Sequence, residues 1–191
     1  MYLYSIFSKT NKMKSFLITS MLLLCFCSSG CGYTSKSLLP DELNSIYVDN
    51  FKNEISATRE VSNVRPTYLY VPGIENTITR AVIDGFIFDR HLDVTRQNDA
   101  ALVLEGALVD MRQYPLSYTD NYNVIEYRLE IFVDIALYNN LTGDLMWRED
   151  RFMGQSNYTV SGPNRLTEAQ ARTKAVNDLA QRVVERVVEY W

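Results

Sequence analysis

The sequence predicts an α+β fold, in which two helices pack on one face of a mostly antiparallel or mixed sheet of about four strands. Two stretches carry apolar residues at helical spacing, one ending near residue 91 and one near the C-terminus. Between them lie long stretches in which apolar and polar residues alternate, as in strands. The order strand, helix, strands, helix indicates an α+β sandwich, and the length suits one domain.

The first part of the domain is expected to hold one strand, one loop and one helix. Residues 45–51 alternate as a strand does, residues 53–65 are polar without a period, and residues 67–71 form a short extended piece. Pro72 suits the first turn of a helix that ends near His91. The apolar residues of this helix recur every four positions: Ile74, Ile78, Val82 and Phe86.

Residues 92–95 are expected to form a short strand and residues 101–111 a longer one. The longer stretch is apolar on both sides, which is typical of a central strand. Residues 114–122 are rich in Tyr, Ser, Asn and Pro and are expected to form a loop.

Residues 124–138 show the clearest alternation in the chain, with charged residues on one face. Residues 139–144 then form a hairpin turn, in which Gly143 supplies a positive φ. Residues 145–158 return as the partner strand, and Trp147 is expected to face the core.

A second helix is expected to close the chain. Thr167 and Gln170 have the spacing of a capping box, which marks the start of a helix. The helix runs almost to Trp191, and its apolar residues recur every three or four positions: Val176, Leu179, Val183 and Val187.

The N-terminal segment has the layout of a secretory signal, and Met13 is a plausible start of the chain. Lys14 precedes an apolar run over residues 17–26, which is too short to span a bilayer as a permanent helix. Cys31 follows Ser-Ser-Gly, which resembles the bacterial lipoprotein signal, although Ser28 stands where that signal prefers Leu. In such proteins the cysteine is acylated and becomes the first residue. The alternative is an ordinary cleaved signal that leaves Cys31 as a free thiol.

These observations predict three regions: a lipoprotein signal peptide over residues 1–30, a lipidated tether over residues 31–44, and one α+β domain over residues 45–191. All three cysteines, Cys25, Cys27 and Cys31, lie in or next to the signal, so the mature part has no internal disulfide. Removing residues 1–30 lowers the basic count from 19 to 16 against 23 acidic residues, a net charge of −7. This balance argues against nucleic acid as a partner.

The sequence offers no positive reason to expect an enzyme. His91 is the only histidine, so neither a histidine-based catalytic triad nor a histidine-rich metal site is expected. We find no glycine-rich phosphate loop, no nucleophile elbow and no tight acidic cluster for a metal. The only prosthetic group expected is the covalent lipid on Cys31.

Two surface features have alternative readings. The tyrosines of residues 114–127 suit either an interaction surface or core packing. Glu126, Arg128, Glu130 and Asp134 share one strand face, which suits either partner binding or a solvated face with cross-strand ion pairs.

Several short motifs occur in an order that resembles the LptE family, the outer-membrane lipoproteins of lipopolysaccharide assembly. The opening Cys31-Gly32-Tyr33 is similar to the first residues of the mature family members. The remaining motifs follow in order: Leu39-Pro40, then Ile46, Val48, Asn50, Phe51 and Asn53, then Leu104-Glu105-Gly106, then Pro115-Leu116-Ser117-Tyr118, then Val124 and Glu126-Tyr127-Arg128-Leu129, and finally Thr142-Gly143-Asp144-Leu145-Met146-Trp147.

The resemblance implies a non-enzymatic protein of cell-envelope biogenesis. Such a protein is anchored by fatty acids such as palmitate to the periplasmic side of the outer membrane, and Gly32 is not the Asp that retains many lipoproteins in the inner membrane. It would bind and plug an LptD-like β-barrel, help that barrel assemble and aid lipopolysaccharide insertion.

Arg112, Arg128 and Arg148 are the candidate contacts for lipopolysaccharide phosphates, against the alternative of surface ion pairs. The alternative function is an accessory or pilot lipoprotein of another envelope export or secretion machine.

Overall fold

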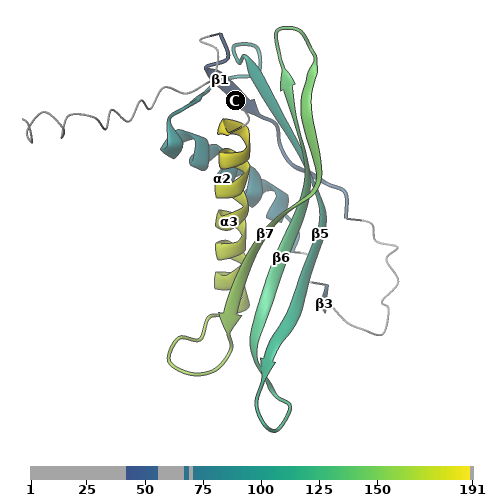
Figure 1. Ribbon diagram of the computed structural model, residues 1–191, viewed down its shortest axis with the longest axis vertical. Coiled ribbons are helices and arrows are strands. Elements are labelled where there is room, and N and C mark those ends of the chain that lie inside the picture. Colours follow the sequence, from purple (N-terminus) through teal and green to yellow (C-terminus); the bar gives the residue numbers. More distant parts are fainter. Residues whose placement is uncertain (1–41, 56–66, 69–70, 190–191) are drawn as a thin grey trace, which may run out of the picture. The chain divides into compact units, whose positions relative to one another are not determined.

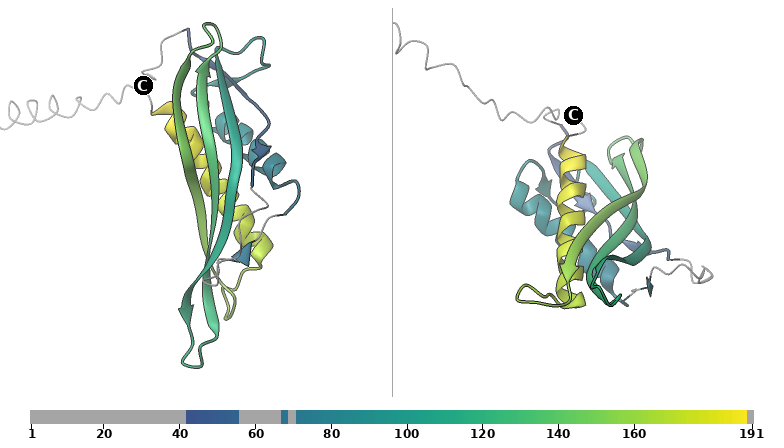
Figure 2. Two further views of the ribbon diagram at one scale, coloured as in Figure 1. Left: turned by 90° about the vertical axis from the view of Figure 1, so that its right-hand side faces the viewer. Right: turned by 60° about the horizontal axis from the view of Figure 1, so that its bottom comes forward.

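The computed structural model describes residues 42–55, 67–68 and 71–189, and within them it confirms the α+β fold with both helices on one face of a sheet (Figures 1 and 2). The predicted signal peptide and most of the predicted tether lie outside the described residues. The elements in chain order are β1 (Ser45–Val48), β2 (Lys52–Asn53), β3 (Thr67–Tyr68), α2 (Ile74–Asp89), β4 (Asp93–Val94), β5 (Leu102–Tyr118), β6 (Val124–Asn139), β7 (Leu145–Thr159) and α3 (Glu168–Val188).

The sheet is mixed and has seven strands, more than the four expected, in the order β4-β1-β5-β6-β7 with β2 and β3 also paired to β5. β1 is parallel to β4 and β5, whereas β5, β6 and β7 are antiparallel neighbours. Three of the strands, β2, β3 and β4, have only two residues each. β4 lies within the short strand expected over residues 92–95 and β3 within the extended piece expected over residues 67–71, whereas the two residues of β2 are too few for an alternating pattern to reveal. The central position predicted for residues 101–111 is confirmed, because β5 has partners on both edges.

Two predicted boundaries near β1 and β5 were wrong. The strand expected over residues 45–51 ends at Val48, because the Phe51 N–H bonds to the Thr79 hydroxyl at 3.0 Å instead of joining a ladder. The loop expected over residues 114–122 is mostly strand, since β5 continues to Tyr118 opposite β6. Tyrosine is favoured in paired strands, and Pro115 is tolerated because it lies beside a shift in strand register.

The helices begin and end close to the predicted positions. α2 starts at Ile74 after Gly73, whose φ is +87°, so Pro72 precedes the helix and does not form its first turn. The capping box of α3 is confirmed: the Gln170 N–H donates to the Thr167 hydroxyl at 3.2 Å, and the Thr167 N–H donates to the Gln170 side chain at 2.9 Å. α3 ends at Val188.

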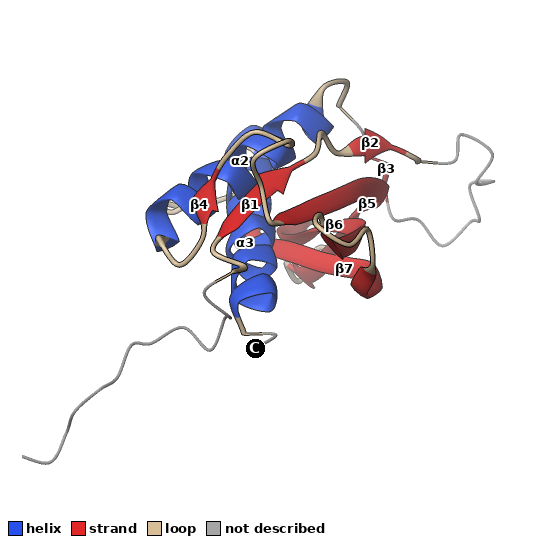
Figure 3. Ribbon diagram, turned by 90° about the horizontal axis from the view of Figure 1, so that it is seen from above, coloured by secondary structure: helices blue, strands red, loops and turns tan. Residues whose placement is uncertain are grey.

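The core lies between the helices and the sheet, as Figure 3 shows from above. Two glycines allow close approach there. A Cβ on Gly106 would lie 2.3 Å from the Phe51 ring, so the Leu-Glu-Gly motif and the first-strand motif meet in the core. A Cβ on Gly154 would lie 2.4 Å from the Leu179 Cβ, so α3 contacts β7 directly. Trp147 faces the core as predicted and is 8% exposed.

Candidate functional site

The face of β5, β6 and β7 that points away from the helices carries most of the charged side chains of the sheet, and we call it the outer face. The alternation of β6 is confirmed, because its residues 129, 131, 133, 135 and 137 are buried on the helix side. A β-bulge between Leu108 and Asp110 in β5 reverses the alternation of that strand. Asp110 therefore lies opposite Phe132 on the outer face, while Met111 points into the core.

A second irregularity in β7 turns another arginine to the outer face. The register between β6 and β7 shifts between Val133 and Ile135, and Arg151 adopts a left-handed φ of +55° at this point. Its backbone N–H donates to the Asp134 carboxylate at 2.7 Å, which holds the bulge. The Arg151 guanidinium then lies 4.4 Å from the centre of the Phe132 ring.

These two bulges build a compact group of four residues, the outer-face cluster: Asp110, Arg112, Phe132 and Arg151. The Asp110 carboxylate is fully buried. It forms ion pairs with the guanidinium groups of Arg112, at 2.5 Å, and Arg151, at 3.4 Å. The Arg112 guanidinium also lies 5.6 Å from the centre of the Phe132 ring, so two cations contact the same ring. A hydrogen bond to the Tyr114 hydroxyl, with a further contribution from Asp110, raises the pKa of Arg112, so its charge is permanent.

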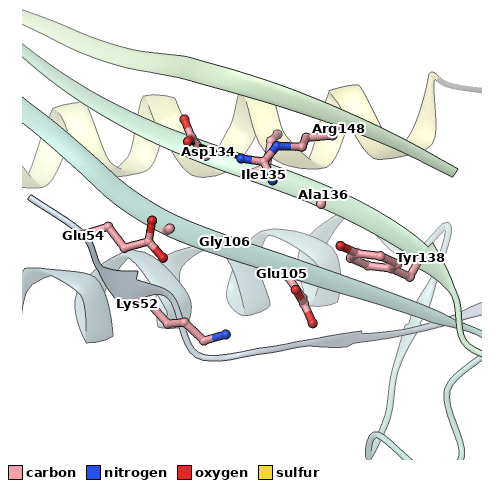
Figure 4. A pocket seen from close by; sticks show the side chains of 10 residues that line it. Lys52, Glu54, Glu105, Gly106, Asp134, Ile135, Ala136, Tyr138 and Arg148 are labelled. Atoms are coloured by element: carbon pink, nitrogen blue, oxygen red, sulfur yellow. Dashed lines mark ion pairs between the residues drawn. The ribbon is translucent and has the colours of Figure 1, made fainter. Parts of the chain in front are cut away.

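Beside the cluster, a polar trough of about 150 Å³ opens on the same face, and Figure 4 shows the side chains around it. Its floor is made of small residues, Gly106, Ala107 and Ala136. Its walls carry charges of both signs and one phenol: Lys52, Glu54, Glu105, Asp134, Tyr138 and Arg148. Carboxylates, two cations and a hydroxyl provide donors and acceptors together, as a ligand rich in hydroxyl groups requires.

Arg148 is the most exposed of the three predicted arginines, at 57% of its side chain. It donates to Asp150 at 2.7 Å and lies 3.7 Å from Asp134. The hydrogen bond to Asp150 raises the pKa of Arg148, so this side chain is also always a cation. Because both carboxylates are partly exposed, the guanidinium can exchange these partners for a ligand at small cost.

The structure places Arg112, Arg128 and Arg148 on the outer face, but it does not bring them together. Arg112 reaches this face only because of the bulge after Leu108. Arg128 bonds to Asn157 at 3.0 Å, four residues along β6 from Phe132. Arg112 is instead grouped with Arg151, which the sequence analysis missed. Strict alternation cannot reveal Arg151, because its direction depends on the bulge in β7.

The tyrosines of residues 114–127 include one that packs in the core and two that are exposed. Tyr127 packs on Tyr158 at 5.8 Å between ring centres, on the helix side of the sheet. Tyr118 and Tyr122 are 52% and 88% exposed at the tip of the hairpin between β5 and β6. Within residues 42–55, 67–68 and 71–189, no group of three or more His, Cys, Asp or Glu residues is arranged to hold a metal ion.

No helix among the described residues is long and apolar enough to cross a membrane. Solved structures with a similar fold include rare lipoprotein B from Shewanella oneidensis, with 17% identity, coverage of 75% of this chain and 98% of the other, and a TM-score of 0.38. A putative lipoprotein from Caulobacter crescentus shows 14% identity, coverage of 78% and 92%, and a TM-score of 0.46. A minor lipoprotein from Acinetobacter baumannii shows 12% identity, coverage of 78% and 94%, and a TM-score of 0.47.

The comparison with curated proteins found no match. The sequence model of a lipopolysaccharide-assembly family, LptE, matches residues 43–190, which include every helix and strand of the described domain. The resemblance noted from the short motifs is thereby confirmed along the whole domain, and the chain belongs to the LptE family of lipopolysaccharide assembly.

Proposed function

We propose that this protein is a lipoprotein of the outer membrane, anchored on its periplasmic side through Cys31, that binds and plugs an LptD-like β-barrel. In this role it helps the barrel assemble and aids the insertion of lipopolysaccharide at the cell surface, without catalysing a reaction. The match of the LptE family model to residues 43–190 is the observation that carries the proposal.

The outer face supports a plugging role because its chemistry suits a wet barrel interior. The interior of a large membrane barrel is polar, so a plug needs a surface that stays hydrated or forms polar contacts. The middle of the sheet offers such a surface, with Glu130, Asp134, Arg148 and the outer-face cluster on one side. The helices and the apolar core occupy the other side of the sheet.

The lipid anchor supports the same role because it keeps the protein close to its partner. A domain that is attached to the membrane of its partner meets that partner at a high effective concentration. Several acyl chains on Cys31 exceed the two membrane signals that stable anchoring requires. The protein thus needs only modest affinity for the barrel to remain bound.

Direct contact with lipopolysaccharide would use the arginines of the outer face. Guanidinium groups bind phosphates through paired, charge-assisted hydrogen bonds. Arg148 is well placed for this, since it is exposed and its closer carboxylate partner, Asp150, is exposed as well. Arg128 is the second candidate, and Arg112 is the least available because it holds the buried Asp110. The trough next to Arg148 would accept sugar hydroxyls.

Depletion of the protein tests the proposed role in the cell. We expect lipopolysaccharide at the cell surface to fall and the folded form of the barrel to become scarce. Surface lipopolysaccharide that stays normal after depletion would contradict the proposal and favour the accessory or pilot lipoprotein of another export machine. Re-expression of the wild-type protein should restore both quantities.

A double substitution tests the arginine contacts independently of the proposed role in the cell. We expect Arg128→Gln with Arg148→Gln to weaken lipopolysaccharide binding to the purified lipoprotein by about tenfold, which corresponds to about 1.4 kcal/mol. The matched control is Arg80→Gln, because Arg80 is exposed on α2, away from the outer face. An equal affinity for all three proteins would show that these arginines form only surface ion pairs.

A further inference from the structure

The described chain begins beside the C-terminal end of α2. The Asn44 carbonyl accepts the Asp93 N–H at 2.9 Å, and Ser45 pairs with Asp93 between β1 and β4. α2 ends at Asp89, only a few residues before β4. Residues 42–45 and the last turn of α2 therefore lie at the same end of the domain (Figure 1).

The hairpin between β6 and β7 lies at this end as well. The Asn140 N–H donates to the Ala101 carbonyl at 2.8 Å, and its side-chain amide donates to the Gln97 carbonyl at 2.7 Å. Residue 97 belongs to the segment that joins β4 to β5. We call the surface formed by residues 42–45, 87–100 and 139–145 the tether end.

The tether end exposes large apolar side chains on two separate segments. Phe88 is 89% exposed and Ile87 is 58% exposed at the end of α2. Leu141 is 71% exposed and Leu145 is 52% exposed on the β6–β7 hairpin. Both segments lie at the tether end, where exposed side chains of this size are suited to an apolar partner.

The proposed anchor limits what that partner can be. Eleven peptide links join Cys31 to Glu42, and even a fully extended chain of that length spans only about 40 Å. If Cys31 carries the lipid, the tether end can never lie farther than this from the leaflet that holds the acyl chains. Lipid is thus the apolar environment that is always within its reach.

We propose that the tether end docks on the phospholipid leaflet, with Phe88, Leu141 and Leu145 entering the region between headgroups and acyl chains. The proposal rests on the proposed anchor at Cys31 and adds a second, side-chain contact with the membrane. Aromatic and branched apolar side chains are suited to this boundary.

The charges of the tether end favour zwitterionic over anionic headgroups. Acidic residues outnumber basic ones there, and repulsion from an anionic surface would weaken the contact. The acidic residues are Glu42, Asp89, Asp93, Asp99 and Asp144, against Arg90 and Arg96.

This contact also orients the domain. β6 runs from Val124 to Asn139, so the hairpin that carries Tyr122 lies about 50 Å along the strand from the tether end. With the tether end on the leaflet, Tyr122 is held away from the lipid, at the end of the domain that would enter a partner. The outer face extends between the two ends (Figure 2).

A single-cysteine experiment tests the docking directly. Cys25 and Cys27 are expected to leave with the signal and Cys31 to be acylated, so a new cysteine would be the only free thiol. The mature lipoprotein is labelled with an environment-sensitive fluorophore at Phe88→Cys and placed in phosphatidylcholine vesicles that contain a nitroxide-labelled lipid. Tyr122→Cys is the matched control, because its side chain is equally exposed at the opposite end.

We expect the probe at position 88 to shift its emission to shorter wavelength and to be quenched by the nitroxide, and the probe at position 122 to do neither. Replacing part of the phosphatidylcholine by phosphatidylglycerol should reduce the quenching at position 88. A vesicle-bound protein whose probe at position 88 stays in water would overturn the docking and leave the anchor intact. Quenching at both positions would overturn the end-on orientation. A protein that leaves the vesicles altogether refutes the anchor and the docking together.

Discussion

The buried carboxylate of the outer-face cluster offers the sharpest test of the site. Asp110→Asn keeps the shape of the side chain and removes its charge. The Asp110 side chain is fully buried, whereas those of Arg112 and Arg151 are 29% and 42% exposed. The substitution therefore leaves two cations that can partly turn to solvent, together with a neutral amide at the centre of the cluster.

The expected loss follows from this difference in burial. Removing one partner of a fully buried ion pair costs about 3–5 kcal/mol, and hydrogen bonds to charged groups contribute about 1.5–3 kcal/mol each. Because the arginines keep access to water and the amide oxygen still accepts one bond, we expect a loss of about 2 kcal/mol in the free energy of unfolding. For a domain of this size that lowers Tm by about 5 °C.

Urea unfolding, followed by the fluorescence of the buried Trp147, measures the loss. The matched control is Asp150→Asn, which removes a carboxylate from the same face. Asp150 also contacts an arginine, Arg148, at 2.7 Å, but its side chain is 67% exposed. We expect no measurable loss of stability for Asp150→Asn, because exposed ion pairs contribute little. Equal stabilities of the two variants would refute the view that burial makes Asp110 the centre of the cluster.

Four further outcomes follow from the structure. Gly154→Ala pushes a methyl group into the backbone of α3 and should cost about 1–3 kcal/mol of stability. Gly85→Ala brings a methyl group to 3.0 Å from the Val184 side chain but gains helix propensity, so it should be near neutral; thermal unfolding compares the two variants. Thr167→Ala removes the capping box of α3 and should cost about 1 kcal/mol in the same assay. Burial raises the pKa of Tyr158 above 10.0, so the folded state keeps this proton after the unfolded state has lost it. The wild type should therefore lose stability as the pH rises above 10.0, and Tyr158→Phe should lose less in urea titrations. Cys31→Ser should leave the fold intact and release the protein from the membrane fraction, as immunoblots of fractionated cells would show; a processed variant that stays membrane-bound would contradict the anchor.

The fold could be predicted where side-chain periodicity determines the structure. The alternation of residues 124–138 indicated β6, and the four-residue spacing after Ile74 indicated α2. The Thr167 capping box located the start of α3, because a cap is a local interaction between residues three apart. Periodicity does not report strand pairing, which is why the two-residue strand β2 escaped it.

The end of β5 shows where local propensity misleads. Tyr114, Pro115 and Ser117 have the composition of a loop, yet they pair with β6. The hydrogen bonds of a neighbouring strand outweigh the weak local preference of these residues. Such tertiary pairing is not visible in the sequence of one segment alone.

Only part of the candidate site could be predicted, again because strand pairing is not visible in one segment of sequence. Alternation assigned Arg128 to the outer face, since β6 pairs with β7 in unbroken register from Glu126 to Val133. Asp110 and Arg151 reach the cluster only because β5 and β7 each have a bulge, and a bulge reverses the direction of every side chain that follows. In the sequence of β5, the sign of this is Asp110, which stands where the alternation of Leu102, Leu104 and Leu108 would place a core residue.

The most direct test of the central claim is to isolate the native protein from detergent-solubilised outer membranes through an affinity tag after Trp191. The account predicts that a large β-barrel protein is recovered with it in equal amount, and that mass spectrometry finds an acylated Cys31 at the mature N-terminus. Recovery of the protein without any barrel, under conditions in which barrels stay folded, would contradict the account.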